Sequence, residues 1–357
     1  MIFSIQTKKN INSLALLTLA FSLLGCGCQK NNNTASNDTL STIKPKAAQS
    51  TTNATDNGSL SPSLPKTISI FNAVKAWQDL VYQVEIGPRY VGSVGSVKTR
   101  QWLKKELDDL GGQVYEQKFT VQTVEGAKEF VNIIACFDPN TKQNSSVTAT
   151  DTLESKTAPS SNSKQTVANE TKETTTIVLG AHYDTKYFKD IDFVGANDGA
   201  SGTAVLLELA RVFQKQPLKQ YFVENFGKAT SPIELEVKDI VAAVIIDMVG
   251  DKKLHLTYDT ISHPQLLEML FNKGRELKFT KQFKRSDVGA ISDDHLPFLL
   301  AKIPAVDIIG FNSNENGLYP SYWHTAEDTL DKVCADSLYV VGTTVELFTR
   351  DLDDVLE

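Results

Sequence analysis

Residues 176–210 read TIVLGAHYDTKYFKDIDFVGANDGASGTAVLLELA. The apolar run at 176–181 predicts a buried strand, and the segment from about Ser201 to Gln214 predicts a helix. His182 and Asp184 follow the strand, and Asp198 precedes the helix in a glycine-rich turn. Open α/β sheets bind ligands at the carboxyl ends of their strands, and residues two apart on an extended backbone point to the same side. We therefore expect these three side chains to converge.

Apolar runs and helical periods alternate along the rest of the chain. Strands are expected at 113–124, 130–137, 240–250, 253–258 and 305–311, and helices at 72–84, 96–112, 264–277 and from about 335 onward. The internal strands are continuously apolar, which is typical of a largely parallel sheet covered by helices on both faces. The sequence thus predicts an α/β fold.

The N-terminus predicts export. A short basic region and an apolar run at 11–24 have the form of a signal peptide at 1–25, because the run is too short for a comfortable membrane span. Residues 23–26, LLGC, resemble a bacterial lipobox, which implies lipid attached to Cys26. An ordinary secretory signal with chance cysteines and a transmembrane anchor are the alternatives. The expected location is a bacterial membrane, facing the periplasm or the exterior.

Two polar tracts divide the rest of the chain. Residues 26–67 have too few apolar side chains to offset the entropy of ordering, which predicts a disordered tether. The domain is expected at 68–357. It contains a low-complexity insertion at 138–175, which both flanking strands assign to the surface.

Composition excludes several classes of protein. The net charge of −7 argues against a nucleic-acid-binding surface. Four cysteines, at 26, 28, 136 and 334, form neither a disulfide framework nor a zinc-finger spacing.

Further carboxylates and imidazoles occur where ligands are expected. Asp247 ends the strand expected at 240–250, Asp293 and Asp294 begin a helical turn, and His324 ends a loop. Oxygen and nitrogen donors without thiolate suit a catalytic zinc, although ligand type leaves other divalent metals open. Each residue also has a structural alternative: Asp198 could cap the helix that follows it, and Asp247 could be an ordinary strand-end aspartate.

Five motifs occur in one order: LGAHYDT, FVGANDGASGTAVLLELAR, IIDMVGD, DDHLPFLLAKIPAVDII and YWHTAEDTLDKV. Together they resemble the M28 zinc peptidases and their glutaminyl cyclase relatives, from about Phe71 to the C-terminal helix. The resemblance implies a three-layer α/β/α fold with a central mixed, mostly parallel sheet. It also implies zinc bound through Asp198 and His324.

The two branches of this family differ in metal count. In two-metal aminopeptidases, the positions of His182 and Asp247 bind a second zinc and Asp198 bridges. In the glutaminyl cyclases one zinc is used, and the positions of Asp247 and Asp294 form an acidic hydrogen-bonded pair. The position of Trp323 lines the substrate pocket there, although core packing is an alternative role for this side chain.

One family motif is absent. A strand ending in Asp-Gly-Glu-Glu or Asp-Gly-Glu-Asp is expected before residue 240, and its acidic residues supply the proton-transfer group and a metal ligand. Here the chain reads QKQPLKQYFVENFGKATSPIELEVKDIV. The resemblance therefore implies that one internal strand is deleted, with Glu224 or Glu234 as substitutes only if the backbone rearranges.

Three functions follow. The first is a zinc-dependent glutaminyl cyclase, which turns N-terminal Gln of peptides or proteins into pyroglutamate with release of ammonia. The second is an aminopeptidase with two zinc ions. The third is a non-catalytic surface lipoprotein without zinc. The partners expected are peptide N-termini, with no nucleic acid, and the membrane is contacted through the N-terminal lipid alone.

Overall fold

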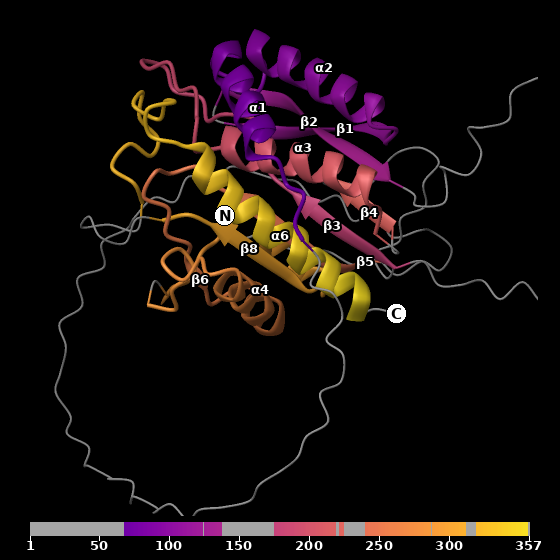
Figure 1. Cartoon of the computed structure of the whole chain (residues 1–357). Coiled ribbons are helices and arrows are strands. Elements are labelled where there is room, and N and C mark those ends of the chain that lie inside the picture. The colour runs from indigo at the N-terminus through magenta and orange to yellow at the C-terminus, as the bar shows by residue number, and fades with distance from the viewer. Residues whose placement is uncertain are drawn as a thin grey trace, which may run out of the picture. The chain divides into compact units, whose positions relative to one another are not determined.

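The computed structural model describes residues 68–123, 125–137, 175–218, 221–224, 240–286, 288–311 and 319–355 (Figure 1). For residues 221–224 the description is confined to the backbone. The expected signal peptide, Cys26, the tether at 26–67 and the insertion lie outside the described residues, apart from Thr175. Predictions for these segments stay predictions. In the described residues no helix is long and apolar enough to cross a membrane.

Helices and strands alternate much as the sequence predicts. The helices of the described residues are α1 (Ala73–Ile86), α2 (Val94–Asp109), α3 (Ala200–Lys215), α4 (Pro264–Glu276), α5 (Leu296–Leu300) and α6 (Ala335–Val355). The strands are β1 (Gln113–Thr123), β2 (Gly126–Phe137), β3 (Thr176–Gly180), β4 (Tyr221–Glu224), β5 (Ile240–Asp247), β6 (Tyr258–Asp259), β7 (Val288–Gly289) and β8 (Ala305–Ile309).

The main sheet is mixed and mostly parallel. Its strand order is β1-β2-β4-β3-β5-β8. The hairpin β1–β2 is antiparallel and β2 pairs antiparallel with β4, whereas the pairs β4–β3, β3–β5 and β5–β8 are parallel. The carboxyl ends of β3 and β5 therefore meet at one edge, which is where His182 and Asp247 were expected.

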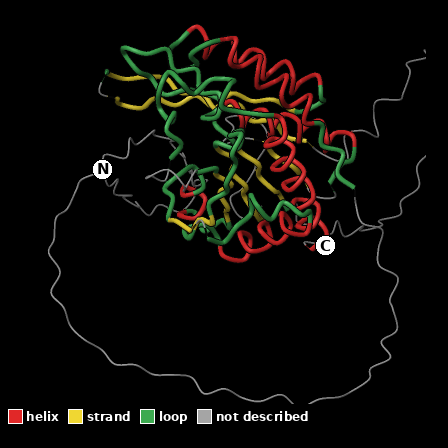
Figure 2. Tube along the Cα trace, turned by 60° about the vertical axis from the view of Figure 1, so that its left-hand side comes forward, coloured by secondary structure: helices red, strands yellow, loops and turns green. Residues whose placement is uncertain are grey.

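The two faces of the sheet bury alternate side chains of the central strands. Leu179 and Ile246 belong to the larger core cluster, which also contains side chains of α1, α3, α4 and α6. Val178 and Ile245 face the opposite cluster, which contains Phe298 of α5. Figure 2 shows the long helices gathered along one side of the strands. The α/β/α arrangement is thus confirmed, with most of the described helices on one face.

The predicted loss of an internal strand is wrong. β4 lies between β2 and β3 and pairs with both, so the internal position of the sheet is filled. Its four residues, YFVE, include three aromatic or β-branched residues, which are typical of strands. The run is too short to stand out from the polar sequence around it, and pairing on both sides satisfies its backbone.

The prediction of a strand at 253–258 is also wrong. This segment forms an isolated bridge between Leu256 and Gly310, and only Tyr258 continues into β6. β6 pairs with β7 in a separate two-stranded sheet. Leu254 and Leu256 are buried because they pack on the main core. The alternation of apolar and polar residues in this segment therefore comes from a loop that packs on the core, not from a strand.

Helix boundaries follow local chemistry. The side chain of Asn72 accepts hydrogen bonds from Val74 N and Lys75 N, as predicted for the start of α1. α2 stops before Gly111, whose φ of +80° suits glycine. Gly202 lets α3 approach β5, since an added Cβ would lie 2.2 Å from Ile246 O.

Candidate metal centre

His182 is held in the orientation that a metal ligand requires. Its Nδ1 lies 3.1 Å from the carbonyl oxygen of Asp184, and an oxygen acceptor there places the proton on Nδ1. The Nε2 atom then faces away from the loop, toward Asp198 and Asp247. In metal-binding histidines, a hydrogen bond donated by the ring nitrogen that does not bind the metal fixes the tautomer and the ring orientation.

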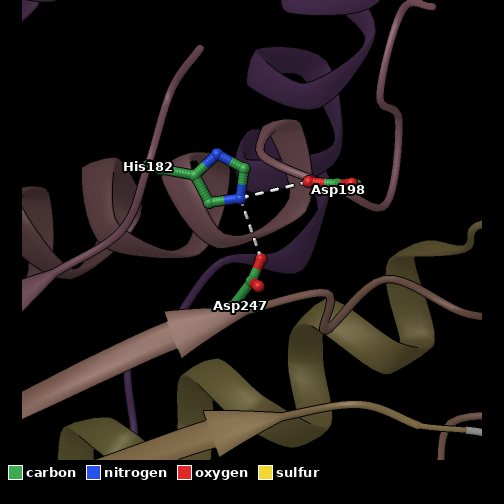
Figure 3. A group of neighbouring side chains, drawn as sticks. All are labelled: His182, Asp198 and Asp247. Carbon is green, nitrogen blue, oxygen red and sulfur yellow. Dashed lines mark hydrogen bonds and ion pairs between the residues drawn. The ribbon is translucent and has the colours of Figure 1, made fainter. Parts of the chain in front are cut away.

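The carboxylates of Asp198 and Asp247 converge on this Nε2 atom (Figure 3). Asp247 Oδ1 lies 3.0 Å and Asp198 Oδ1 lies 3.2 Å from His182 Nε2. One ligand atom from each residue lies within 4.8 Å of the others. His182 and Asp198 converge as expected and Asp247 joins them, whereas Asp184, the third residue expected, contributes mainly its backbone carbonyl.

The electrostatics of the three side chains are strongly coupled. Burial alone would lower the pKa of His182, but the charge of Asp247 and hydrogen bonds to the surrounding aspartates raise it well above its ordinary value. Burial opposes ionisation of Asp198, yet the adjacent imidazoles of His182 and His324 lower its pKa. A cation at this position is thus favoured, whether a proton or a metal ion supplies the charge.

The turn that carries Asp198 is shaped by two glycines. Gly195 has φ +52°, and a Cβ there would lie 2.2 Å from Asp198 O. Gly199 has φ +99°, and a Cβ there would lie 2.8 Å from Asp184 O. Gly199, with no side-chain hydrogen bond, is the N-cap of α3, so the alternative role of Asp198 as a helix cap is not observed.

The second oxygen of Asp198 faces another histidine. Asp198 Oδ2 lies 3.2 Å from His324 Nε2, yet it is buried and accepts no hydrogen bond from the described residues. Each oxygen of one carboxylate therefore faces a different imidazole. This is the arrangement of a carboxylate that can serve two adjacent cation positions.

His324 lies in a strained and aromatic setting. Its φ is +57°, which is uncommon for a residue with a side chain and recurs at functional sites. Trp323 stacks on His324 with ring centroids 3.6 Å apart, and Tyr319 stacks on the other side of Trp323 at 3.8 Å. Trp323 also packs against a small apolar cluster, so it has both a core contact and a contact with the histidine.

Asp293 and Asp294 form an acidic group next to this centre. Burial and the charge of Asp247 raise the pKa of Asp293 well above its ordinary value. Burial, with the charges of Asp247 and Asp184, raises the pKa of Asp294 to about 7, and His182 opposes this shift. Among the described residues no hydrogen bond joins Asp247 to Asp294, so the expected pair is close but not bonded.

Asp293 and Asp294 are followed by His295, which belongs to a fully buried group of titratable side chains. His295 Nε2 lies 3.1 Å from Asp259 Oδ2, and its Nδ1 lies 3.8 Å from Asp307 Oδ2. Burial, with the charges of Asp293 and Asp247, raises the pKa of Asp307 well above its ordinary value. Asp259 and Asp307 were not among the site residues expected from the sequence. The available signal was Asp307 itself, a carboxylate in the middle of the apolar strand β8.

A cavity of about 360 Å³ lies beside His324. It is formed by the loop at 186–193 together with Pro88 and Tyr90. Phe188 and Phe193 line it and also pack edge-on against His324, with ring centroids 5.8 and 5.9 Å away. Trp323, the residue expected to line a pocket, is not among the residues lining this cavity.

The comparisons with known proteins agree with this geometry. The family model described as Peptidase family M28 matches residues 164–349, more than half of the chain. The chain belongs to peptidase family M28. Glutaminyl-peptide cyclotransferase of Drosophila melanogaster is 26% identical over 71% of this chain and 75% of its own length.

Solved structures share the fold over most of the chain. Glutaminyl cyclase of Porphyromonas gingivalis is 25% identical, with a TM-score of 0.64, over 79% of this chain and 99% of its own. A Zn-dependent exopeptidase from Parabacteroides distasonis shares the fold at 24% identity and a TM-score of 0.62, over 78% of this chain and 98% of its own.

The residues present fit a zinc ion. His182, Asp198 and Asp247 offer one nitrogen and two oxygens, and His324 with Asp198 Oδ2 offers a second pair. Zinc accepts imidazole and carboxylate ligands, and catalytic zinc keeps a position open. The buried Oδ2 of Asp198, without a hydrogen bond, is the atom that such a cation would satisfy.

Proposed function

We propose that this M28 protein is a zinc-dependent glutaminyl cyclase that converts N-terminal Gln of peptides to pyroglutamate with release of ammonia. One observation carries the proposal: the Asp198–His324 pair, stacked against Trp323, lies at the same sheet edge as the carboxyls of Asp247 and Asp294. The first group suits a Lewis acid, and the second suits proton transfer.

The reaction needs both groups. The α-amine nitrogen attacks the γ-amide carbon, a C–N bond forms, the bond to the amide nitrogen breaks, and a proton passes from the amine to the departing ammonia. Zinc, when bound, supplies polarisation of the amide carbonyl. Asp294, whose pKa is about 7, is suited both to give and to take a proton near neutral pH.

Glu224 is a further candidate for the proton-transfer role. It is the last residue of β4 and pairs in register with Leu179, three residues before His182. The chain has no Asp-Gly-Glu sequence after this strand. The family's proton-transfer glutamate follows the corresponding strand, so we propose that Glu224 replaces it.

The aromatic ring of Trp323 and the cavity at 186–193 would accommodate the rest of the substrate. His324 and Tyr319 cover the two faces of the Trp323 ring, so we assign its edge to contact with the side chain of the N-terminal residue. The cavity shares Phe188 and Phe193 with the environment of His324, so we assign it to the residues that follow in the peptide. An extended peptide advances about 3.3–3.6 Å per residue, and we assign its second or third residue to this cavity.

An aminopeptidase is the second candidate, and the compact group of His182, Asp198 and Asp247 favours it, because this group could hold a second metal ion. The test is incubation of the zinc-loaded protein with peptides that begin with Gln or Leu. Pyroglutamyl peptide and ammonia without free amino acid support the cyclase. Free N-terminal amino acid supports the peptidase, and no product from either peptide supports the non-catalytic alternative.

The N-terminal segment bears on where the protein acts. We propose that the protein is exported and attached to a bacterial membrane through lipid on Cys26, which would place the site among extracytoplasmic peptides. Metabolic labelling with a fatty acid tests this assignment, since Cys26→Ser should abolish the label.

A further inference from the structure

We infer that Arg89 and Asp328 are positioning residues that hold the three histidine- and aspartate-bearing segments of the metal centre in register. Arg89 is fully buried and Asp328 is 1% exposed, and neither was a candidate in the sequence analysis. The inference rests on the proposed metal site.

Arg89 joins the two ends of the loop between β3 and α3. Its Nε donates to Tyr183 O at 2.9 Å, next to His182. Its Nη1 donates to Val194 O at 2.7 Å and its Nη2 to Gly195 O at 3.1 Å, just before Asp198. The planar guanidinium presents these donors in a fixed fork, so it sets the spacing between the two ends of the loop.

Further hydrogen bonds connect Arg89 to the C-terminal end of α1 and to the loop after β3. Nη1 also donates to Gln83 O at 3.1 Å and Gly87 O at 3.4 Å, and the backbone N of Arg89 donates to Thr185 Oγ1 at 2.8 Å. Burial lowers the pKa of Arg89 to about 10, which leaves the side chain charged at neutral pH. The interactions use backbone carbonyls rather than a carboxylate partner, as expected for a residue that organises a loop.

Asp328 holds the same turn from the other side. Its Oδ1 accepts from Asn197 N at 2.8 Å, its Oδ2 accepts from Asp198 N at 3.0 Å, and its carbonyl accepts from Ala196 N at 3.1 Å. Asp328 lies four residues after His324 in the same loop. It therefore ties the backbone of Asp198 to the segment that carries His324.

Together the two residues engage every position of the turn at 194–198. Arg89 takes the carbonyls of its first two residues, and Asp328 takes the N–H groups of its last three. A buried guanidinium and a buried carboxyl group thus fix one short turn, the first through carbonyl groups and the second through N–H groups. Because outer partners of metal ligands typically contribute about 10- to 100-fold to metal affinity, we expect an effect of that size here.

The test is zinc affinity, measured by competition with a chelator, for wild type, Arg89→Lys and Asp328→Asn. Lysine keeps the positive charge of Arg89 but lacks the planar guanidinium with its several N–H donors. Asparagine keeps the shape of Asp328, but its amide NH₂ group would face one of the backbone N–H groups that the carboxyl oxygens now accept from. Both variants should bind zinc at least about 10-fold more weakly. Urea unfolding of the metal-free proteins reports any general loss of stability.

Arg211→Lys is the matched control. Arg211 is also buried, but its carboxylate partners Asp79, Glu106 and Glu208 lie on α1, α2 and α3, away from the metal centre. This variant should lose stability while its zinc affinity stays within about threefold of wild type, and activity is not needed for the readout.

The outcomes separate the two claims. If wild type binds zinc and both site variants bind it within threefold, or if Arg211→Lys weakens binding as much as they do, the positioning role is wrong. If wild type binds no zinc, both the metal site and the positioning role are wrong. Weakened zinc binding in the two variants of a protein that makes no pyroglutamate would support the positioning role and contradict the proposed reaction. If Arg89→Lys does not fold, Asp328→Asn decides alone.

Discussion

The two oxygens of Asp198 give this residue a different role from its neighbours. Oδ1 faces His182 and Oδ2 faces His324, so loss of this carboxylate removes a donor from both cation positions. His182 and Asp247 belong to one position alone. Substitutions at Asp198 and His182 therefore distinguish a site with one zinc from a site with two.

We expect Asp198→Asn to weaken zinc binding about 100-fold or more, because the amide is neutral and a poor zinc ligand. His182→Ala should retain one zinc with affinity within about tenfold of wild type, because the proposed zinc lies between Asp198 and His324. Elemental analysis after gel filtration measures both. Asp190→Asn, an exposed aspartate in the same loop, is the control. Loss of all zinc in His182→Ala would contradict the single-zinc assignment.

Cys136 provides a pH-dependent prediction away from the metal centre. Burial raises its pKa from 9.0 to about 11, so the reactive thiolate is disfavoured in the folded protein. At pH 8 the folded protein should carry about 100-fold less thiolate at Cys136 than the unfolded protein. Native and urea-unfolded protein are compared by alkylation and peptide mass mapping. Equal rates at Cys136 in the two states would contradict the prediction.

At the scale of elements, β4 is the feature with the largest consequence. Its four residues bring Glu224 to the carboxyl end of a strand that neighbours β3. The prediction of a deletion used the absence of a long apolar run. A strand that is paired on both sides can be shorter than such a run, because its neighbours supply its hydrogen bonds.

Glu224→Gln should lower kcat for a Gln-peptide about 10²- to 10⁴-fold, the usual contribution of a general acid or base. Zinc content and the unfolding midpoint should stay near those of wild type. Glu234→Gln is the control, because Glu234 is the other carboxylate weighed for this role. If kcat is unchanged in Glu224→Gln, or falls only in Glu234→Gln, then Glu224 is not the proton-transfer residue.

The loop at 186–193 should set preference for the peptide beyond its first residue. Tyr187 lines the cavity, is 44% exposed and packs edge-on against Tyr90. We expect wild type to favour an aromatic over a glycine third residue in kcat/KM, and Tyr187→Ala to lose about 1 kcal/mol of this preference, the scale of an aromatic contact.

Tyr339→Ala is the matched control for this preference. Tyr339 is 45% exposed and packs edge-on against Phe279 on another part of the molecule. The ratio of kcat/KM values for the two peptides should be unchanged in Tyr339→Ala. A wild-type ratio near one, or the same ratio in both variants, would exclude the loop as a determinant of preference.

At the scale of the whole molecule, the long elements and the sheet edge were predictable. Continuous apolar runs place β3 and β5, whose ends position His182 and Asp247, and the glycine-rich turn before α3 positions Asp198. Arg89 and Asp328 were not predictable, because they act through backbone carbonyls and N–H groups that are distant in sequence. Such contacts leave no period or motif in a single sequence.

The central claim is that the edge formed by His182, Asp198, Asp247 and His324 holds catalytic zinc. The most direct measurement is zinc per chain in protein that begins near Ser61 and is purified without chelator. The account predicts one tightly bound zinc per chain, lost in Asp198→Asn. No bound zinc, in a chain that circular dichroism shows to be folded, would contradict the claim and leave an M28 protein without its metal chemistry.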